Sequence, residues 1–133
     1  MQKHKGQAMV EFALILPLFL FMVYGIIYFG MLFHDYSSLS NIARSCAREA
    51  AITETLDEAA IQSIKNRYTQ TSINQLWTSL YKLNNENDFT ISENSTTKEI
   101  SVTIKMTLSS APVLLSSVLP ETFDIVYFMR KDS

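Results

Sequence analysis

A long uncharged stretch near the N-terminus limits what this chain can fold into. Residues 12–33 read FALILPLFLFMVYGIIYFGMLF, and none of these 22 side chains carries a charge. At a rise of about 1.5 Å per residue, a helix of that length covers the roughly 30 Å hydrocarbon core of a bilayer. A buried helix of a small soluble domain would carry polar residues on one face, and this stretch has no polar face. The stretch therefore predicts a transmembrane helix.

The charges on either side of the stretch predict its orientation. Lys3 and Lys5 precede it, whereas the segment after it begins with His34 and Asp35 and has its first arginine at Arg44. Basic flanks stay preferentially on the cytoplasmic side of a membrane. We therefore expect a single-pass protein of the inner (cytoplasmic) membrane, with a cytoplasmic N-terminus and an extracytoplasmic C-terminal domain.

The residues before the helix resemble a class III, or prepilin-type, signal. A short basic leader ends at Gly6, and Glu11 stands at the edge of the apolar run. In such signals a membrane-embedded prepilin peptidase cuts after the glycine. The resemblance thus implies a leader at residues 1–6, a processing site at Gly6 and Gln7, and Gln7 as the first residue of the mature chain. A secretory signal peptide fits badly, because its apolar region is shorter and a small-residue cleavage site follows it.

The first 50 residues narrow this resemblance to one family. The run GQAMVEFALILP at 6–17 is followed by Gly25, by Phe29-Gly30, by NIAR at 41–44 and by CAREAA at 46–51. In combination these pieces resemble the TadE-like family, pilin-like pseudopilins of the tight-adherence (Tad) pilus. The resemblance implies a minor pseudopilin, a structural subunit in assembly of a Tad or type IV-like pilus for adhesion or secretion. Its implied partners are membrane lipid, the prepilin peptidase, other pilin-like subunits and the pilus assembly platform.

Glu11 is the most informative polar residue of the chain. A carboxylate at the membrane edge is costly to bury and tends to occur where something pairs with it. The family resemblance implies that Glu11 pairs with the α-amino group that cleavage frees on Gln7 of a neighbouring subunit. On the residues alone a second interpretation stays open, in which Glu11 marks the interfacial end of the helix and contacts lipid headgroups.

The helix is expected to continue past the membrane to about Ile52, and to kink near Pro17. Beyond residue 31 apolar residues recur at spacings of three and four, with polar residues between them. The apolar positions are Leu32, Tyr36, Leu39, Ile42, Ala43, Cys46 and Ala50, and the polar ones are Asp35, Ser38, Asn41, Arg44, Arg48 and Glu49. The expected domains are the leader at 1–6, the transmembrane helix at 7–33 and the extracytoplasmic domain at 34–133.

The rest of the chain predicts a small α+β domain. Residues 55–58 have the spacing of a capping box, so a second helix is expected from about Leu56 to Leu83, with a polar middle at 69–72 where it weakens or divides. Trp77 and Tyr81 are expected in the core. After a turn at 84–88 the period changes to two, which indicates strands at 89–92, 99–108 and 123–129. A short apolar helix or loop is expected at 113–119. The predicted fold is a pilin-like, membrane-anchored α+β fold with helices packed on a three-stranded antiparallel sheet.

Composition and motifs argue against several functions. A net charge of −2 over 133 residues, with no basic cluster, predicts no nucleic-acid binding. His4 and His34 lack the spacing of a metal site, and there is no nucleophile elbow or Gly-rich phosphate loop, so we expect no enzyme, no metal and no cofactor. The single Cys46 excludes an intrachain disulfide and leaves an intermolecular one open. The alternative function that stays open is a single-pass membrane protein whose extracytoplasmic domain binds a ligand or partner.

Overall fold

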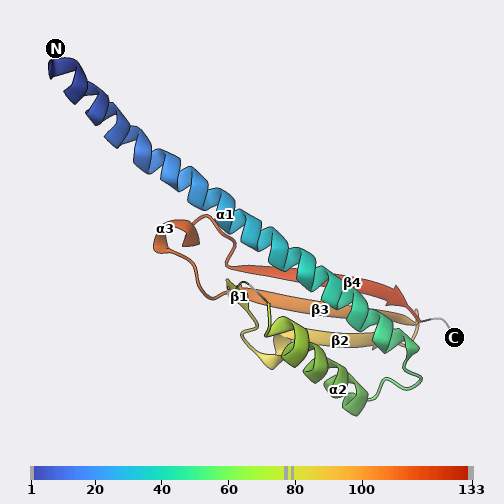
Figure 1. Cartoon of the computed structure of the whole chain (residues 1–133). Coiled ribbons are helices and arrows are strands. Elements are labelled where there is room, and N and C mark those ends of the chain that lie inside the picture. Colours follow the sequence, from blue (N-terminus) through green and yellow to red (C-terminus); the bar gives the residue numbers. More distant parts are fainter. Residues whose placement is uncertain (1, 77, 79, 132–133) are drawn as a thin grey trace.

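The structure is a computed structural model that describes residues 2–76, 78 and 80–131. One long helix, α1 (Gln2–Ile52), begins the chain, and a small domain packs against its C-terminal half (Figure 1). The N-terminal half of α1 extends away from that domain (Figure 1). The predicted continuation of the first helix to about Ile52 is therefore confirmed.

The free part of α1 is long and apolar enough to cross a membrane. An 18-residue window of this helix has a mean hydropathy of 2.4, and none of the window is buried inside the protein. The helix continues on both sides of Pro17, so the kink expected there stays a prediction. An exposed apolar helix of this kind suggests a single-pass membrane anchor.

The second helix is shorter than the sequence predicted. α2 (Glu58–Tyr68) begins after Asp57, whose Oδ1 accepts a hydrogen bond from the backbone N–H of Ala60 at 3.0 Å. Asp57 is therefore the N-cap residue of α2, and the prediction of a capping box that starts at Thr55 is wrong. A carboxylate at this position accepts the backbone hydrogen bond and also interacts favourably with the positive end of the helix dipole. A short π-helix, η1 (Thr69–Ile73), ends the helical region.

The regular α-helix ends at Tyr68, where the polar run at 69–72 begins and the π-helix takes over. Threonine and serine side chains lose rotamer freedom in a helix or bond to nearby backbone groups, and both effects weaken helical structure. Trp77, which was expected on the apolar face of this helix, lies outside the described residues. Tyr81 is 2% exposed, which confirms its place in the core.

Within the described residues the sheet has four antiparallel strands, so the predicted number of three is wrong. They are β1 (Tyr81–Lys82), β2 (Phe89–Asn94), β3 (Glu99–Leu108) and β4 (Thr122–Arg130). β3 is central and pairs with β4 along one edge and with β2 and β1 along the other. The additional strand arises where the second helix was expected to end, because the chain returns to the sheet there and Tyr81 pairs with Leu108. The three longer strands were all predicted.

The core lies between the sheet and the helices α1 and α2, which cover the same face (Figure 1). Alternate residues of β3 are fully buried, which confirms the predicted alternation: Ile100, Val102, Ile104 and Met106. The residues of α1 that face them are mostly small and also fully buried: Leu39, Ala43, Cys46, Ala47 and Ala50. Small side chains let the helix lie close to the sheet at the packing density of a protein interior. An ion pair between Arg67 of α2 and Glu49 of α1 joins the two helices.

Two short elements complete the domain. A turn of 3₁₀-helix, η2 (Glu86–Asp88), precedes β2. The other is α3 (Val113–Ser116), in the connection between β3 and β4, and it confirms the short apolar helix expected there. Lys98, in the turn between β2 and β3, has a φ of 52°, and its carbonyl accepts a hydrogen bond from the N–H of Lys131 at 2.8 Å.

Candidate functional site

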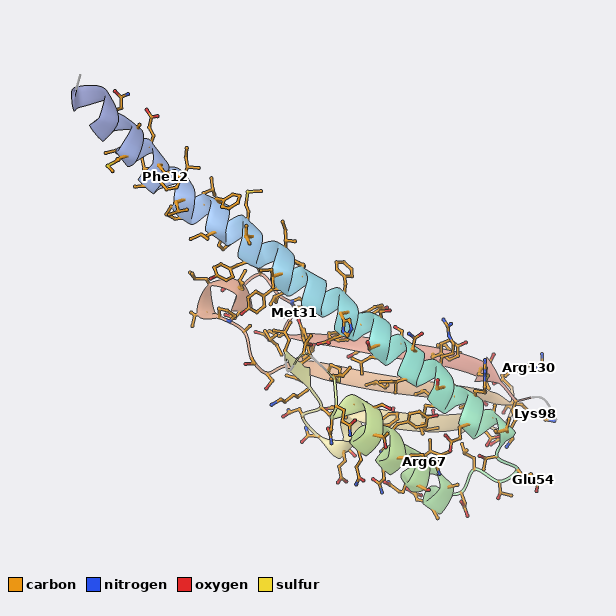
Figure 2. All side chains as sticks on the ribbon, in the orientation of Figure 1. Phe12, Met31, Glu54, Arg67, Lys98 and Arg130 are labelled. Atoms are coloured by element: carbon orange, nitrogen blue, oxygen red, sulfur yellow. The ribbon has the colours of Figure 1, made fainter. Side chains whose placement is uncertain are left out.

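The predicted processing and pairing residues lie together at the free end of α1. Gly6, Gln7 and Glu11 all lie within the helix and are exposed. The spacing of four residues puts Gln7 and Glu11 on one face, and Nε2 of Gln7 donates a hydrogen bond to Oε1 of Glu11 at 3.3 Å. Figure 2 shows Phe12, where the apolar stretch begins, next to this end of the helix. The structure therefore brings the three predicted site residues together.

The packing of the chain does not require a glycine at position 6. A Cβ placed there meets no atom within 4 Å, and the same holds for Gly25 and Gly30. A glycine inside a helix costs roughly 0.5–1 kcal/mol relative to alanine, so Gly6 weakens the helix locally without a packing gain in this chain. The three glycines therefore allow matched substitutions that leave the fold unchanged.

The helix beyond Glu11 exposes large apolar side chains on every side. Their exposed fractions include 65% for Phe12, 73% for Leu14 and 64% for Leu18. A helix that packed one stripe against a partner protein would be polar elsewhere, whereas lipid solvates all faces equally. This surface is therefore suited to hydrocarbon, and Glu11 stands at its edge.

A buried carboxyl group lies at the junction of α1 and the domain, and the sequence reasoning missed it. Asp35, expected on the polar side of the helix, is fully buried, so that assignment is wrong. The hydroxyl of Thr78 donates a hydrogen bond to Oδ2 of Asp35. Oδ1 lies 3.7 Å from Nδ1 of His34, and no described residue donates a hydrogen bond to it. The helical spacing to Leu39 was the signal that Asp35 faces inward.

The cysteine of the chain is packed against the sheet. Cys46 is fully buried, and burial, with a smaller contribution from the charge of Glu49, raises the pKa of its thiol to about 12. The thiolate is the form that attacks a disulfide, so a thiol with this pKa is inert near neutral pH. This environment disfavours the intermolecular disulfide that the sequence left open.

The hollows of the domain are partly open and lined by both polar and apolar side chains. One of about 290 Å³ lies between α2 and the turn at 83–86, where Nζ of Lys65 donates a hydrogen bond to the carbonyl of Glu86 at 3.2 Å. Among the described residues no three His, Cys, Asp or Glu side chains lie close enough together to hold a metal ion. The residues that fit a function expected from the sequence are Gly6, Gln7 and Glu11 at the free end of α1.

The comparisons with known proteins concern that same end of the chain. Residues 6–48 match a family described as TadE-like protein. No curated protein and no solved structure matches. The matched segment includes Gly6, Gln7, Glu11 and the whole apolar stretch, and it stops within α1, before α2 and the sheet. Residues 6–48 are therefore similar to the TadE-like family, as the sequence indicated, and this likeness covers about a third of the chain.

Proposed function

We propose that this chain is a minor pseudopilin, a structural subunit in assembly of a Tad or type IV-like pilus. It is inserted in the inner membrane with its N-terminus in the cytoplasm, cut after Gly6 by the prepilin peptidase, and joined to other pilin-like subunits at the assembly platform. The TadE-like match over residues 6–48 carries this proposal, because it spans the processing site, Glu11 and the apolar helix together.

The geometry at the free end of α1 supports pairing through Glu11. Its carboxylate already reaches one turn back to the side chain of Gln7 at 3.3 Å, a contact with a neutral amide. Cleavage after Gly6 frees a cationic amine at the backbone of Gln7. The amine of an adjacent subunit would give Glu11 a charge-assisted hydrogen bond, which is roughly twice as strong as a neutral one. Assembly then satisfies a carboxylate that hydrocarbon would otherwise penalise.

The position of Gly6 also suits proteolysis. A peptidase needs the backbone of its substrate unwound at the cleaved bond, and Gly6 lies inside α1. Glycine favours the helix by about 0.8–1 kcal/mol less than alanine does, so the helix opens more readily at Gly6 than it would at an alanine. The proposal gives the outer domain a structural role and assigns the chain no catalysis, metal or cofactor.

Mass spectrometry of the protein extracted from membranes tests this proposal. In a host with a working prepilin peptidase the chain is expected to begin at Gln7. Gly6→Leu should block cleavage, because the bulky side chain occupies the position that the peptidase reads, and residues 1–6 should remain attached. Gly30→Leu is the matched control, since a Cβ at Gly30 also meets no atom within 4 Å, and it should be cleaved normally. An intact leader on the unmodified chain would contradict the proposal.

A further inference from the structure

The connection that carries α3 presents apolar side chains on two sides. Segment 109–120 reads SSAPVLLSSVLP and contains no charged residue. Leu115 and Leu119 face the core and are 5% and 4% exposed. Val113, Leu114 and Val118 face outward and are 86%, 77% and 53% exposed. The inner side is therefore covered by the protein, and the outer side forms an apolar tip.

The outward position of the tip is fixed by contacts at its end. The hydroxyl of Tyr81 donates a hydrogen bond to the carbonyl of Pro120 at 2.8 Å. The Tyr81 ring packs edge to face on Phe123, the second residue of β4, with ring centroids 4.7 Å apart. The packed pair of Tyr81 and Phe123 thus fixes the end of the connection, and the apolar tip faces outward.

The connection also satisfies many of its own polar groups. The hydroxyl of Ser116 donates to the carbonyl of Val113 at 2.8 Å. Backbone N–H groups bond to carbonyls within the same segment, and these donors are Leu115, Ser116, Val118 and Leu119. Backbone groups that enter the hydrocarbon boundary must find partners inside the protein, so this local bonding fits a segment in contact with lipid.

The connection lies beside the part of α1 that leaves the domain (Figure 1). Tyr28, Met31 and Leu32 of α1 are partly buried and pack against the core that includes Leu115 and Leu119. These three α1 residues belong to the span predicted at 7–33. A segment that packs beside residues 28–32 of α1 therefore either contacts the lipid itself or replaces lipid around those residues.

The apolar length of α1 lets the helix span the membrane and the connection meet its surface. About 20 residues of helix cover the roughly 30 Å hydrocarbon core, and residues 8–28 have that length. Such a span puts the outer boundary near Tyr28, whose amphipathic ring suits the interface. Glu11 then lies at the cytoplasmic edge of the span, to within about one helical turn.

We infer that α3 and its connection form a second membrane contact, with Val113, Leu114 and Val118 inserted in the outer leaflet of a lipid bilayer beside α1. The inference rests on the single-pass topology of the proposed function. Lipid is the occupant that the observations favour, because the apolar tip continues the lipid-facing surface of α1 and segment 109–120 has no charge for a protein partner to read. Two contacts in place of one fix the orientation of the outer domain on the membrane.

Spin labels on the full-length chain test this contact at one copy per lipid nanodisc. Nitroxides are attached to cysteines introduced as Leu114→Cys, Leu18→Cys and Ser95→Cys. Leu18 lies in the span of α1, and Ser95 lies in the turn before Lys98, at the opposite end of the sheet (Figure 2). Cys46 is fully buried and does not compete for the label. Collisions of each label with oxygen, which concentrates in lipid, are compared with collisions with a water-soluble nickel chelate.

The expected result is a ratio of oxygen to nickel collisions that is severalfold higher at residues 18 and 114 than at residue 95. A label at 114 that behaves like the one at 95, with 18 still in lipid, would overturn the inference and leave the membrane span intact. Labels in water at both 18 and 114 would contradict the proposed topology itself. If the label at 114 is shielded from both reagents only in discs that hold two copies, a second subunit covers the tip and the lipid assignment is wrong.

Discussion

A hydrogen bond between a buried carboxyl group and a buried hydroxyl joins α1 to the segment before β1. Asp35 is fully buried and Thr78 is 6% exposed. A buried oxygen without a hydrogen bond costs its full desolvation penalty. Loss of this bond would therefore destabilise the fold by more than the net strength of the bond itself. The bond lies at the point where α1 leaves the domain and its exposed apolar segment begins.

Replacing Thr78 by valine keeps the shape of the side chain and removes the donor. Oδ2 of Asp35 then loses its hydrogen bond, which should lower the free energy of unfolding by about 1–3 kcal/mol. Urea denaturation of the full-length chain in detergent measures the loss. Thr90→Val, at an exposed position of β2, is the matched control and should change the free energy by no more than about 0.5 kcal/mol. Equal effects of the two substitutions would contradict a role for the Thr78 hydroxyl.

Local sequence patterns could not predict this pair. The helical period places Asp35 on the same face as Leu39. An aspartate side chain is usually exposed to water, however, which favours the opposite face. The partner hydroxyl lies 43 residues further along the chain. Their contact depends on where the segment after η1 returns to the sheet. Neither the sequence around Asp35 nor the sequence around Thr78 determines that position by itself.

At the scale of elements, long uniform patterns were predictable and the end of α2 was not. β3 keeps one period over its whole length, and α1 keeps one beyond residue 31, so the bounds of β3, the C-terminal end of α1 and most of their buried faces follow from the sequence. After Ile73 the apolar residues Leu76 and Leu80 still follow a helical spacing, yet the helical region has ended, and both residues pack in the core of the domain. The spacing of three and four residues therefore continues beyond the point where the helix ends in the structure.

Ala47→Leu tests how closely α1 packs on the sheet. Ala47 is fully buried, and a larger side chain in a well-packed core typically costs about 1–3 kcal/mol. Ala59→Leu, at an exposed position of α2, is the matched control, because alanine and leucine have similar helix propensities. Urea denaturation should show a loss of stability for Ala47→Leu and little change for Ala59→Leu. If the two variants are equally stable, the close approach of α1 to the sheet is wrong.

At the scale of the whole molecule, one helix provides both the exposed apolar segment, which is long enough to cross a membrane, and a layer of the C-terminal domain. Gly6, Gln7 and Glu11 are close in sequence and lie at the end of that helix, so their positions could be predicted from the sequence. Their proposed roles involve a peptidase and a neighbouring subunit, and no pattern within one chain fixes those contacts. The C-terminal domain lies largely beyond the segment that matches the family, and hydrophobic periodicity and turn residues predicted most of its elements.

The amount of pilus made by a Glu11→Ala strain tests the central claim most directly. The variant should insert and lose residues 1–6 normally, because the leader and the apolar helix are unchanged. Without the carboxylate the charge-assisted bond to the neighbouring amine is lost, which is worth about 1.5–3 kcal/mol, and assembled pili in sheared fractions should fall by roughly tenfold or more. Gln7→Ala removes only the neutral contact within one chain and, once processed, should assemble normally. Normal amounts of pili from Glu11→Ala would contradict the pairing on which the account depends.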